Sequence, residues 1–278
     1  MLSGHRYTKI LQLIEEKRSI TVSELTELLG ISESTARRDI TALDKAGKLT
    51  KVFGGAVALD SAFLSLEPTV AEKKEVYKEE KQKIAKYAAS LIEPDDFVYL
   101  DAGTTTGYML DYIEETKAVF VTNAVAHAQK LAARGIRVIL IGGELKSSTE
   151  AIVGAASVPQ LLNYHFMKGF FGTNGICRSA GLTTPDLNEA LVKKAAMGQC
   201  REVWVVSDHS KFNVVGSVTF APLLGENDYP GSEPLDGYMG GAGYHQPMHM
   251  VERQQALKII TDSRPEEYSD FANIILVQ

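Results

Sequence analysis

The chain has 278 residues, of which 45% are hydrophobic and 23% are charged. This length predicts about two domains, and the composition argues against a disordered or fibrous protein. The net charge of −6 argues against a protein that coats nucleic acid with its whole surface.

The charge is distributed unevenly along the chain. Residues 1–57 contain nine Lys and Arg against seven Asp and Glu, a net charge of +2, which leaves −8 for the rest. A slightly basic head on an acidic body is expected when only the head binds DNA. Alone, this asymmetry is weak support for a DNA-binding head.

The sequence favours an intracellular protein. No apolar run approaches the ~20 residues that a membrane-spanning helix needs, and the first residues lack a signal-peptide core. We therefore expect a cytoplasmic chain with no membrane partner. Cys177 and Cys200 are not spaced as metal ligands, so we expect two reduced thiols.

The head begins with two predicted helices. Apolar residues recur at helical spacing over 10–14 and indicate a first helix that ends at Ser19. Thr21, with Glu24 three residues later, forms a capping-box pattern at the start of a second helix over 22–29.

A glycine turn leads to a third predicted helix. Gly30 supplies the turn, Ser32 caps a helix over 33–46, and Gly47 closes that helix. Two short helices joined in this way are typical of a helix-turn-helix, whose second member enters the major groove of DNA. The residues expected to face the other helices are Ala36, Ile40 and Leu43, and those left on the outer faces are Ser34, Arg37, Arg38 and Thr41.

The outward side chains suit DNA binding. Arginine can bond bidentately to guanine or to phosphate, and Ser or Thr near the helix start can reach base edges or the DNA backbone. The alternative is that Arg37 and Arg38 form only a solvated face beside Asp39 and Asp44.

A wing and a specific signature complete the head. Residues 48–57 form two short β-like runs with glycines between them, as in a wing. The run 31–40 (Ile-Ser-Glu-Ser-Thr-Ala-Arg-Arg-Asp-Ile), followed by Gly54-Gly55-Ala56, closely resembles the signature of the DeoR family of bacterial transcription regulators. The resemblance implies a winged helix-turn-helix domain over 1–58 that binds double-stranded operator DNA through Ser32, Ser34, Thr35, Arg37, Arg38, Thr41 and Lys51.

The wing departs from the family pattern at two positions. Lys51 stands where the family usually has arginine, and Phe53 stands where it usually has histidine. Lysine can still meet phosphate as a point charge, but it lacks the fork geometry of arginine.

Residues 59–75 are interpreted as a linker. The mixed stretch 60–68 ends in an Xaa-Pro step, which is typical of a hinge. Residues 73–91 then predict one long helix with Lys- and Glu-rich faces. We interpret its charged run as a solvated face, with a partner-binding surface as the alternative.

The remaining chain, 76–278, alternates between strand-like and helical segments, which predicts a layered α/β domain of mostly parallel strands. The strand-like runs are 97–100, 118–121, 138–141, 168–171 and 203–206, and the helical stretches are 105–113, 124–133 and 187–197.

Polar residues and glycines follow each predicted strand. The stretch from Asp101 to Thr106 has the composition of a strand-to-helix turn that can hold an anion, because glycine lets the backbone approach and the threonines add hydroxyl donors. Ligands of such folds bind beyond the carboxyl ends of the strands, so we expect one phosphate-binding pocket. Each segment alone could be a simple turn, above all Gly142-Gly143.

The same segments are similar to the C-terminal sensor domain of the DeoR family. That domain resembles ribose-5-phosphate isomerase and coenzyme-A-transferase-like folds and senses phosphorylated sugars or related metabolites. Thr184-Pro185-Asp186, with Glu189 and Lys193, also fits the family pattern, with structural roles favoured over ligand contacts. Carried over by position, the effector-binding residues would be Asp101, Gly103, Thr104, Thr105, Thr106, Asn123, Gly142, Gly143, Glu144, Gly172, Asn174, Gly175 and Lys211.

An insertion at about 225–256 departs from the family pattern. Six Gly and three Pro within 225–247 predict a loop or lid. His245 and His249 are four residues apart, but Pro247 breaks the helix that would align them, so we expect no metal site. A Gly-Ala-Gly run in this stretch lacks the third glycine and the preceding strand of a dinucleotide-binding fingerprint.

The sequence therefore predicts a transcription regulator, a repressor of carbohydrate genes whose operator binding responds to a phosphorylated sugar or similar metabolite. We expect no enzyme activity, no cofactor and a homodimer or homotetramer. The alternative is a sugar-phosphate isomerase-like enzyme with an attached DNA-binding head. Thr173 and Asn174 stand where related isomerases place acidic residues, which leaves Glu144 and Glu189 as candidate bases.

Overall fold

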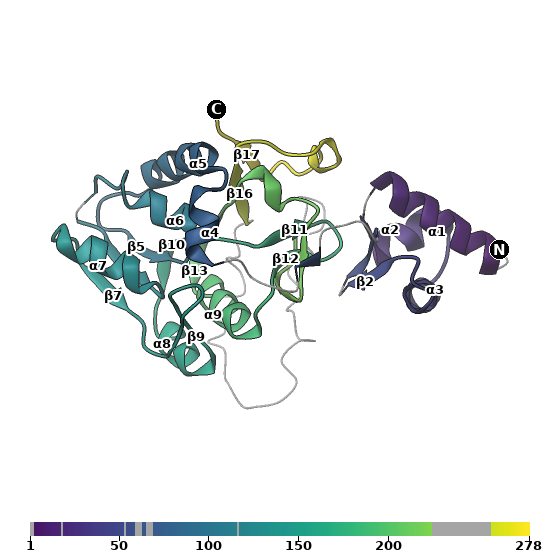
Figure 1. Ribbon diagram of the computed structural model, residues 1–278, viewed down its shortest axis with the longest axis horizontal. Helices are drawn as coiled ribbons and strands as arrows, with labels where there is room; N and C mark the ends of the chain where they lie inside the picture. Colours follow the sequence, from purple (N-terminus) through teal and green to yellow (C-terminus); the bar gives the residue numbers. More distant parts are fainter. Residues whose placement is uncertain are drawn as a thin grey trace.

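The computed structural model describes residues 3–17, 19–52, 54–58, 63–64, 69–115, 117–223 and 257–278. A small N-terminal head stands beside a larger α/β body (Figure 1). No helix in these ranges combines the length and the apolar character needed to cross a membrane.

The head is a winged helix-turn-helix, as expected. Its antiparallel sheet has the order β1-β3-β2, and its core is formed by apolar residues that recur along the helices, such as Ile10, Leu25 and Ile40. Its elements are α1 (Ser3–Lys17), β1 (Ser19–Thr21), α2 (Val22–Leu29), α3 (Glu33–Lys45), β2 (Thr50–Val52) and β3 (Gly55–Val57).

Caps set the bounds of the head helices. The Thr21 hydroxyl accepts a hydrogen bond from the Glu24 N–H at 3.0 Å, and the Glu24 carboxylate accepts one from the Thr21 N–H at 2.8 Å, which confirms the capping box. Gly30 ends α2 in the left-handed region, with φ of 60°. Ser32 caps α3 through the Thr35 N–H, as predicted.

The prediction of a single helix over 73–91 is wrong. The structure has two helices, α4 (Val70–Glu75) and α5 (Lys78–Ser90), separated at Tyr77, whose φ is 51°. The Lys81 ammonium, on α5, donates hydrogen bonds of 2.6 Å to the Lys73 and Val76 carbonyl oxygens and so satisfies the end of α4. Lys81 is only 3% exposed, so it does not belong to a solvated face.

The body contains a seven-stranded parallel sheet in the order β17-β16-β13-β10-β5-β6-β7, which confirms the predicted α/β class. The strands are β5 (Phe97–Leu100), β6 (Val119–Thr122), β7 (Val138–Leu140), β10 (Phe166–Phe171), β13 (Cys200–Val206), β16 (Lys258–Thr261) and β17 (Ile274–Leu276). The helices that follow α5 are α6 (Thr104–Met109), α7 (Val125–Ala133), α8 (Val158–Leu161) and α9 (Leu187–Met197).

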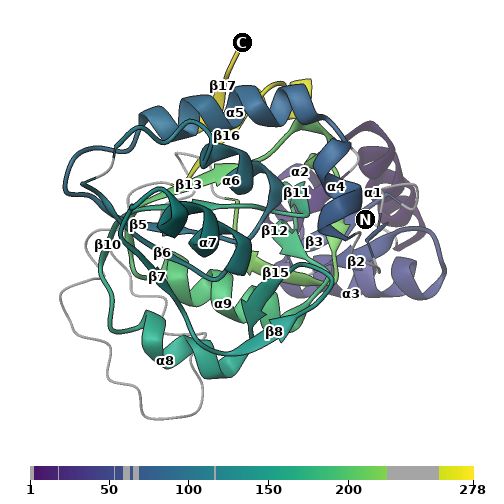
Figure 2. The same cartoon turned by 60° about the vertical axis from the view of Figure 1, so that its left-hand side comes forward.

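Helices cover both faces of this sheet (Figure 2). Successive strand residues point to opposite faces. On β5, Val98 and Leu100 therefore pack with α5 and α6, whereas Tyr99 packs with Val192 and Ala196 of α9.

Smaller sheets surround the carboxyl ends of the parallel strands. An antiparallel sheet has the order β11-β12-β15, β8 pairs with β9, and β14 pairs in parallel with β4 of the connector. Their bounds are β4 (Phe63–Leu64), β8 (Glu144–Lys146), β9 (Ala151–Val153), β11 (Gly175–Cys177), β12 (Gly181–Thr184), β14 (Val215–Gly216) and β15 (Val218–Ala221). Short 3-10 turns occupy Ala155–Ser157, His209–Lys211 and Glu266–Tyr268.

Some sequence predictions fall on residues outside these described ranges. They include Phe53, most of the expected hinge at 60–68, and the whole insertion at about 225–256 with its two histidines. The domain boundaries at 58 and 75 also remain predictions. Cys177 and Cys200 are both buried free thiols.

Candidate functional site

The outer face of α3 is open to solvent. Ser34, Arg37 and Arg38 are exposed, and the Thr41 hydroxyl accepts a hydrogen bond from the Lys51 ammonium at 3.0 Å, which ties the wing to this helix. The side chains of this face line a shallow groove: Ser34, Arg37, Arg38, Thr41, Ala42 and Lys45. Five residues predicted for DNA binding are thus brought together here, and Ser32 and Thr35 form the N-terminal cap of the same helix.

Asp39 is not part of that face. It is 4% exposed and accepts hydrogen bonds from Arg6 of α1 at 2.6 and 3.0 Å. Its carboxylate raises the pKa of the Arg6 guanidinium. The acidic residue of the signature, Asp39, therefore fixes α1 against α3. Its carboxylate does not lie on the exposed face that carries Arg37 and Arg38.

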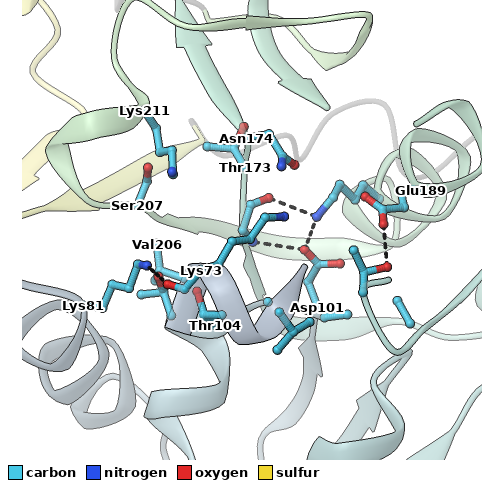
Figure 3. Close-up of a pocket in the computed structure, with 18 of the residues that line it drawn as sticks. Lys73, Lys81, Asp101, Thr104, Thr173, Asn174, Glu189, Val206, Ser207 and Lys211 are labelled. Atoms are coloured by element: carbon cyan, nitrogen blue, oxygen red, sulfur yellow. Dashed lines mark hydrogen bonds and ion pairs between the residues drawn. The ribbon is translucent and has the colours of Figure 1, made fainter. Parts of the chain in front are cut away.

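A pocket lies at the carboxyl ends of the parallel strands (Figure 3). As expected for this class of sheet, the turns after β5, β6, β10 and β13 all contribute to it. Eight predicted effector-binding residues line it: Asp101, Gly103, Thr104, Thr105, Asn123, Gly172, Asn174 and Lys211.

Five predicted effector-binding residues are not among those that line the pocket. The buried Thr106 hydroxyl donates to the Asp101 and Gly103 carbonyl oxygens at 2.7 and 3.0 Å, so it holds the turn together. The other four are two glycines, a glutamate and a buried glycine. Gly142 lies against Gln160 and Gly143 against Ser157. Glu144 is exposed on β8, and Gly175 is buried in β11.

The pocket also contains residues that the sequence reading assigned elsewhere or did not single out. Glu189 and Lys193 stand four apart on α9, one helical turn, and both are buried. Their spacing on a helix that also carries the buried residues Ala190, Val192 and Ala196 could have indicated that this polar pair faces inward. Lys73 and Lys81 carry no such signal, because they belong to an evenly charged run. The other lining residues are Val70, Ala102, Thr149, Ala151, Thr173, Val206, Ser207 and Asp208.

A buried ion pair forms one wall of the pocket. The Lys193 ammonium contacts Asp101 Oδ2 and donates to the Gly172 carbonyl oxygen at 3.1 Å. Asp101 Oδ2 also accepts from the Gly172 N–H at 3.0 Å. Burial raises the pKa of Asp101, an effect that Lys193 opposes. Asp101 Oδ1 is buried and has no hydrogen-bond partner among the described residues, so it can accept a bond from a ligand hydroxyl.

Glu189 organises a second part of this wall. Its Oε1 accepts hydrogen bonds from Lys146 at 3.0 Å and from the Thr149 hydroxyl at 2.8 Å. Its Oε2 accepts one from the Thr184 hydroxyl at 3.2 Å. The carboxylate thus joins α9 to the β8–β9 turn and to β12.

Cationic side chains occupy the opposite side. In Figure 3, Lys81, Ser207 and Lys211 lie across the pocket from Asp101 and Glu189. Lys81 Nζ is 3.9 Å from Asp208 Oδ2, and burial lowers the pKa of this lysine. Lys81 and Lys211 thus lie on one side of the pocket, with Asp208 beside Lys81. Asp101 and Glu189 lie on the other side, where Lys193 is paired with Asp101.

His127 supports the turn that holds Thr104 and Thr105. It lies on α7 beneath Gly103 and Gly107, and burial lowers its pKa to about 4 from the ordinary 6.5. Between about pH 4 and pH 6.5, His127 is therefore protonated in the unfolded chain but neutral in the folded chain.

This shift predicts a pH dependence of stability. The contribution of the neutral His127 to the free energy of unfolding should be complete above pH 6.5. At about pH 5 this contribution should be smaller by about 2 kcal/mol. Urea unfolding of the wild type and of His127→Gln at neutral pH and at about pH 5 measures the difference. An equal loss in both proteins would show that other groups cause it.

Comparison with known proteins identifies the chain. A model described as a DeoR-like helix-turn-helix domain matches residues 6–62, and a model of the DeoR C terminal sensor domain matches residues 77–225. The chain belongs to the DeoR family of transcription regulators. Among its relatives, the uncharacterized HTH-type transcriptional regulator FruR of Bacillus subtilis is 43% identical over 82% of this chain and 89% of its own length.

Other members of the DeoR family match over similar shares. The HTH-type transcriptional regulator IolR of Bacillus subtilis is 34% identical over 78% of this chain and 86% of its own length. The lactose phosphotransferase system repressor of Streptococcus mutans is 34% identical over 80% and 89%. Among solved structures, ribose 5-phosphate isomerase A of Methanocaldococcus jannaschii matches with a TM-score of 0.37 and 16% identity, over 49% of this chain and 55% of its own.

The DeoR-family domains fit the two sites described above. The first model spans α3 and the wing, and the second begins at Tyr77 and spans the turns after β5, β6, β10 and β13. Within the described residues, no group of three or more His, Cys, Asp or Glu could hold a metal ion.

Proposed function

We propose that this DNA-binding regulator represses genes of carbohydrate metabolism and that a phosphorylated sugar or similar metabolite in the pocket changes its affinity for operator DNA. The α3 face supports the first part, because its arginines are free of the core and can enter a major groove. Relatives named as repressors of an aga operon and of a lactose phosphotransferase system support the carbohydrate class.

The placement of Lys81 and Lys211 across the pocket from Asp101 carries this proposal (Figure 3). A sugar phosphate has one strongly anionic end and one end rich in hydroxyls. Lys81 and Lys211, with the Thr104 and Thr105 hydroxyls, suit the phosphate. Asp101, whose Oδ1 lacks a partner among the described residues, suits a sugar hydroxyl.

We propose that the pocket binds its ligand without turning it over. Thr173 and Asn174 offer no general base, and Glu144 does not line the pocket. Glu189 does line it, but its two carboxylate oxygens accept the three hydrogen bonds described above, which leaves it poorly placed to take a substrate proton. Isomerisation of ribose 5-phosphate by the purified protein, lost in Glu189→Gln or in Asp101→Asn, would overturn this part of the proposal.

The function is tested by titrating the protein onto the DNA upstream of its own gene with a panel of sugar phosphates. We expect one of them to shift the DNA-binding curve and so to identify both the effector and the sign of its effect. A curve unmoved by every phosphorylated sugar, with binding of an uncharged sugar instead, would contradict the phosphate assignment.

Loss of one pocket cation should weaken effector binding without changing operator binding. We expect Lys211→Ala to weaken effector binding by ~10- to 100-fold, because a hydrogen bond to a charged group contributes about 1.5–3 kcal/mol. Operator affinity without effector should stay unchanged, since Lys211 lines the pocket of the body and does not belong to the face of α3. Calorimetry with the identified sugar phosphate measures the loss.

Lys83→Ala is the matched control, because Lys83 is exposed on α5 and does not line the pocket. Thr104→Ala and Thr105→Ala should weaken effector binding in the same direction through lost hydroxyl donors. Equal effector affinity in Lys211→Ala and Lys83→Ala would place the phosphate elsewhere.

We further propose that the protein acts as a homodimer or homotetramer, since two heads on one operator read half-sites about 34 Å apart or multiples of that distance. A sedimentation measurement on the purified chain decides between the two assemblies, and a monomer on operator DNA would contradict both.

A further inference from the structure

The wing of the head lies against the body. Val57 of β3 shares an apolar cluster with Cys177, Ala180 and Val215 of the body, and Val52 of β2 packs against that cluster. Val57 and Cys177 are 2% and 1% exposed. In both cartoon views the wing strands lie beside β11 and β12 (Figures 1 and 2). Side chains therefore hold the head to the body, in addition to the connector.

Two adjacent glycines of the wing serve different contacts. A Cβ on Gly55 would lie far inside contact distance of the Ile20 carbonyl oxygen, so Gly55 is required for the pairing of β3 with β1 inside the head. A Cβ on Gly54 would instead lie far inside contact distance of the Ser179 carbonyl oxygen, which belongs to the body. Gly54 thus makes room for the body and not for the head.

The hairpin that meets the wing also reaches the pocket. Ser179 lies in the turn between β11 and β12, whereas Asn174, directly before β11, lines the pocket. The Asn174 N–H donates to the Thr183 carbonyl oxygen at 3.1 Å, so both hairpin strands are tied together at the pocket end. At about 3.3 Å per residue, three residues separate the pocket wall from the wing contact by ~10 Å.

We propose that the tip of the β11–β12 hairpin, residues 177–180, is the docking surface for the wing of this chain's own head, and that this contact carries the state of the pocket to the head. Gly54 is the positioning residue of the contact. The docked wing leaves Arg37 and Arg38 exposed, so the docked head can bind DNA. Ligand in the pocket moves the hairpin relative to the sheet and so changes how the head is held.

Cys177 is a built-in reporter of docking. Its thiol lies in the contact, whereas Cys200, the other cysteine, is buried inside the body against Ala196. Alkylation of a buried thiol requires an opening of the structure that covers it. The rate of Cys177 alkylation in the full chain therefore measures undocking, and the rate of Cys200 alkylation measures unfolding of the body.

The test compares Gly54→Ala with Gly198→Ala, a control whose Cβ would make only ordinary contacts at 3.6 Å. Ala180→Asp attacks the same contact from the body side. We expect Gly54→Ala and Ala180→Asp to raise the Cys177 rate by about tenfold or more, with Cys200 unchanged, and Gly198→Ala to leave both rates as in the wild type. Equal Cys177 rates in all four proteins, or a parallel rise at Cys200, would overturn the docking surface.

A second measurement tests the relay and rests on the proposed function. With the sugar phosphate identified by titration, the ratio of operator affinities with and without it should be about one in Gly54→Ala, whichever way it departs from one in the wild type, since coupling requires a shared two-state element. If Gly54→Ala exposes Cys177 but leaves this ratio of operator affinities as in the wild type, the wing contact does not carry the state of the pocket to the head. The alkylation assay needs neither DNA nor metabolite, so its failure is distinct from a failure of the proposed function.

Discussion

Replacing Arg37 and Arg38 together by alanine is expected to abolish specific operator binding. Both guanidinium groups are exposed on α3. Each contact of this kind contributes about 1–3 kcal/mol in each head, so an operator that binds two heads loses several kcal/mol. Neither residue contributes to the buried core of the head, so the fold should persist.

The single variants separate the roles of the two arginines. If the arginine contacts a base, its removal should reduce the protein's preference for the operator sequence. If it contacts a phosphate, its removal should weaken binding to all DNA sequences equally and should lower the slope of DNA affinity against salt concentration by about one. Arg201→Ala, at an exposed arginine of the body, is the matched control. Operator affinity that is equal in the double variant and in this control would exclude α3 as the recognition helix.

The second large effect is on stability. Lys193→Met is expected to reduce the free energy of unfolding by about 3–5 kcal/mol, because it leaves the Asp101 carboxylate buried without its ionic partner. Asp101 and Lys193 are 1% and 5% exposed, so both charges are largely removed from solvent. Urea unfolding followed by circular dichroism measures the change.

A double-variant cycle isolates the ion pair. Asp101→Asn with Lys193→Met removes both charges and should recover part of the stability that the single Lys193→Met variant loses. Lys194→Met, one residue further along α9 and exposed, is the matched control and should change stability little. Additive losses in the double variant would show that the two side chains do not act as a pair.

Much of the architecture could be predicted because local chemistry fixes it. The capping box at Thr21 sets the start of α2, and Asp186 caps α9 by accepting a hydrogen bond from the Glu189 N–H at 3.0 Å. The pocket could be placed because parallel strands end at one edge of a sheet, so the turns after β5 and β10 had to meet.

The failures share a physical cause. A hydroxyl or ammonium in a turn can face a ligand or satisfy the backbone, and the sequence is the same in both cases. Thr106 bonds to backbone carbonyls, while its neighbour Thr105 lines the pocket. Lys81 stands in an evenly charged run, yet it is buried at the end of α4. The partner of Gly54 lies more than a hundred residues away in the chain, where no local pattern indicates it.

The short helix α4 has a practical consequence for work on separated parts of such regulators. Val70 and Lys73 line the pocket, and the Val70 N–H is bonded to the Ser148 carbonyl oxygen at 3.2 Å. Both residues precede the segment that matches the sensor-domain model, which starts at residue 77. A recombinant fragment cut at that boundary would carry a pocket with one wall missing. Ligand screens on an isolated sensing unit should therefore use a fragment that begins before Thr69, the cap of α4.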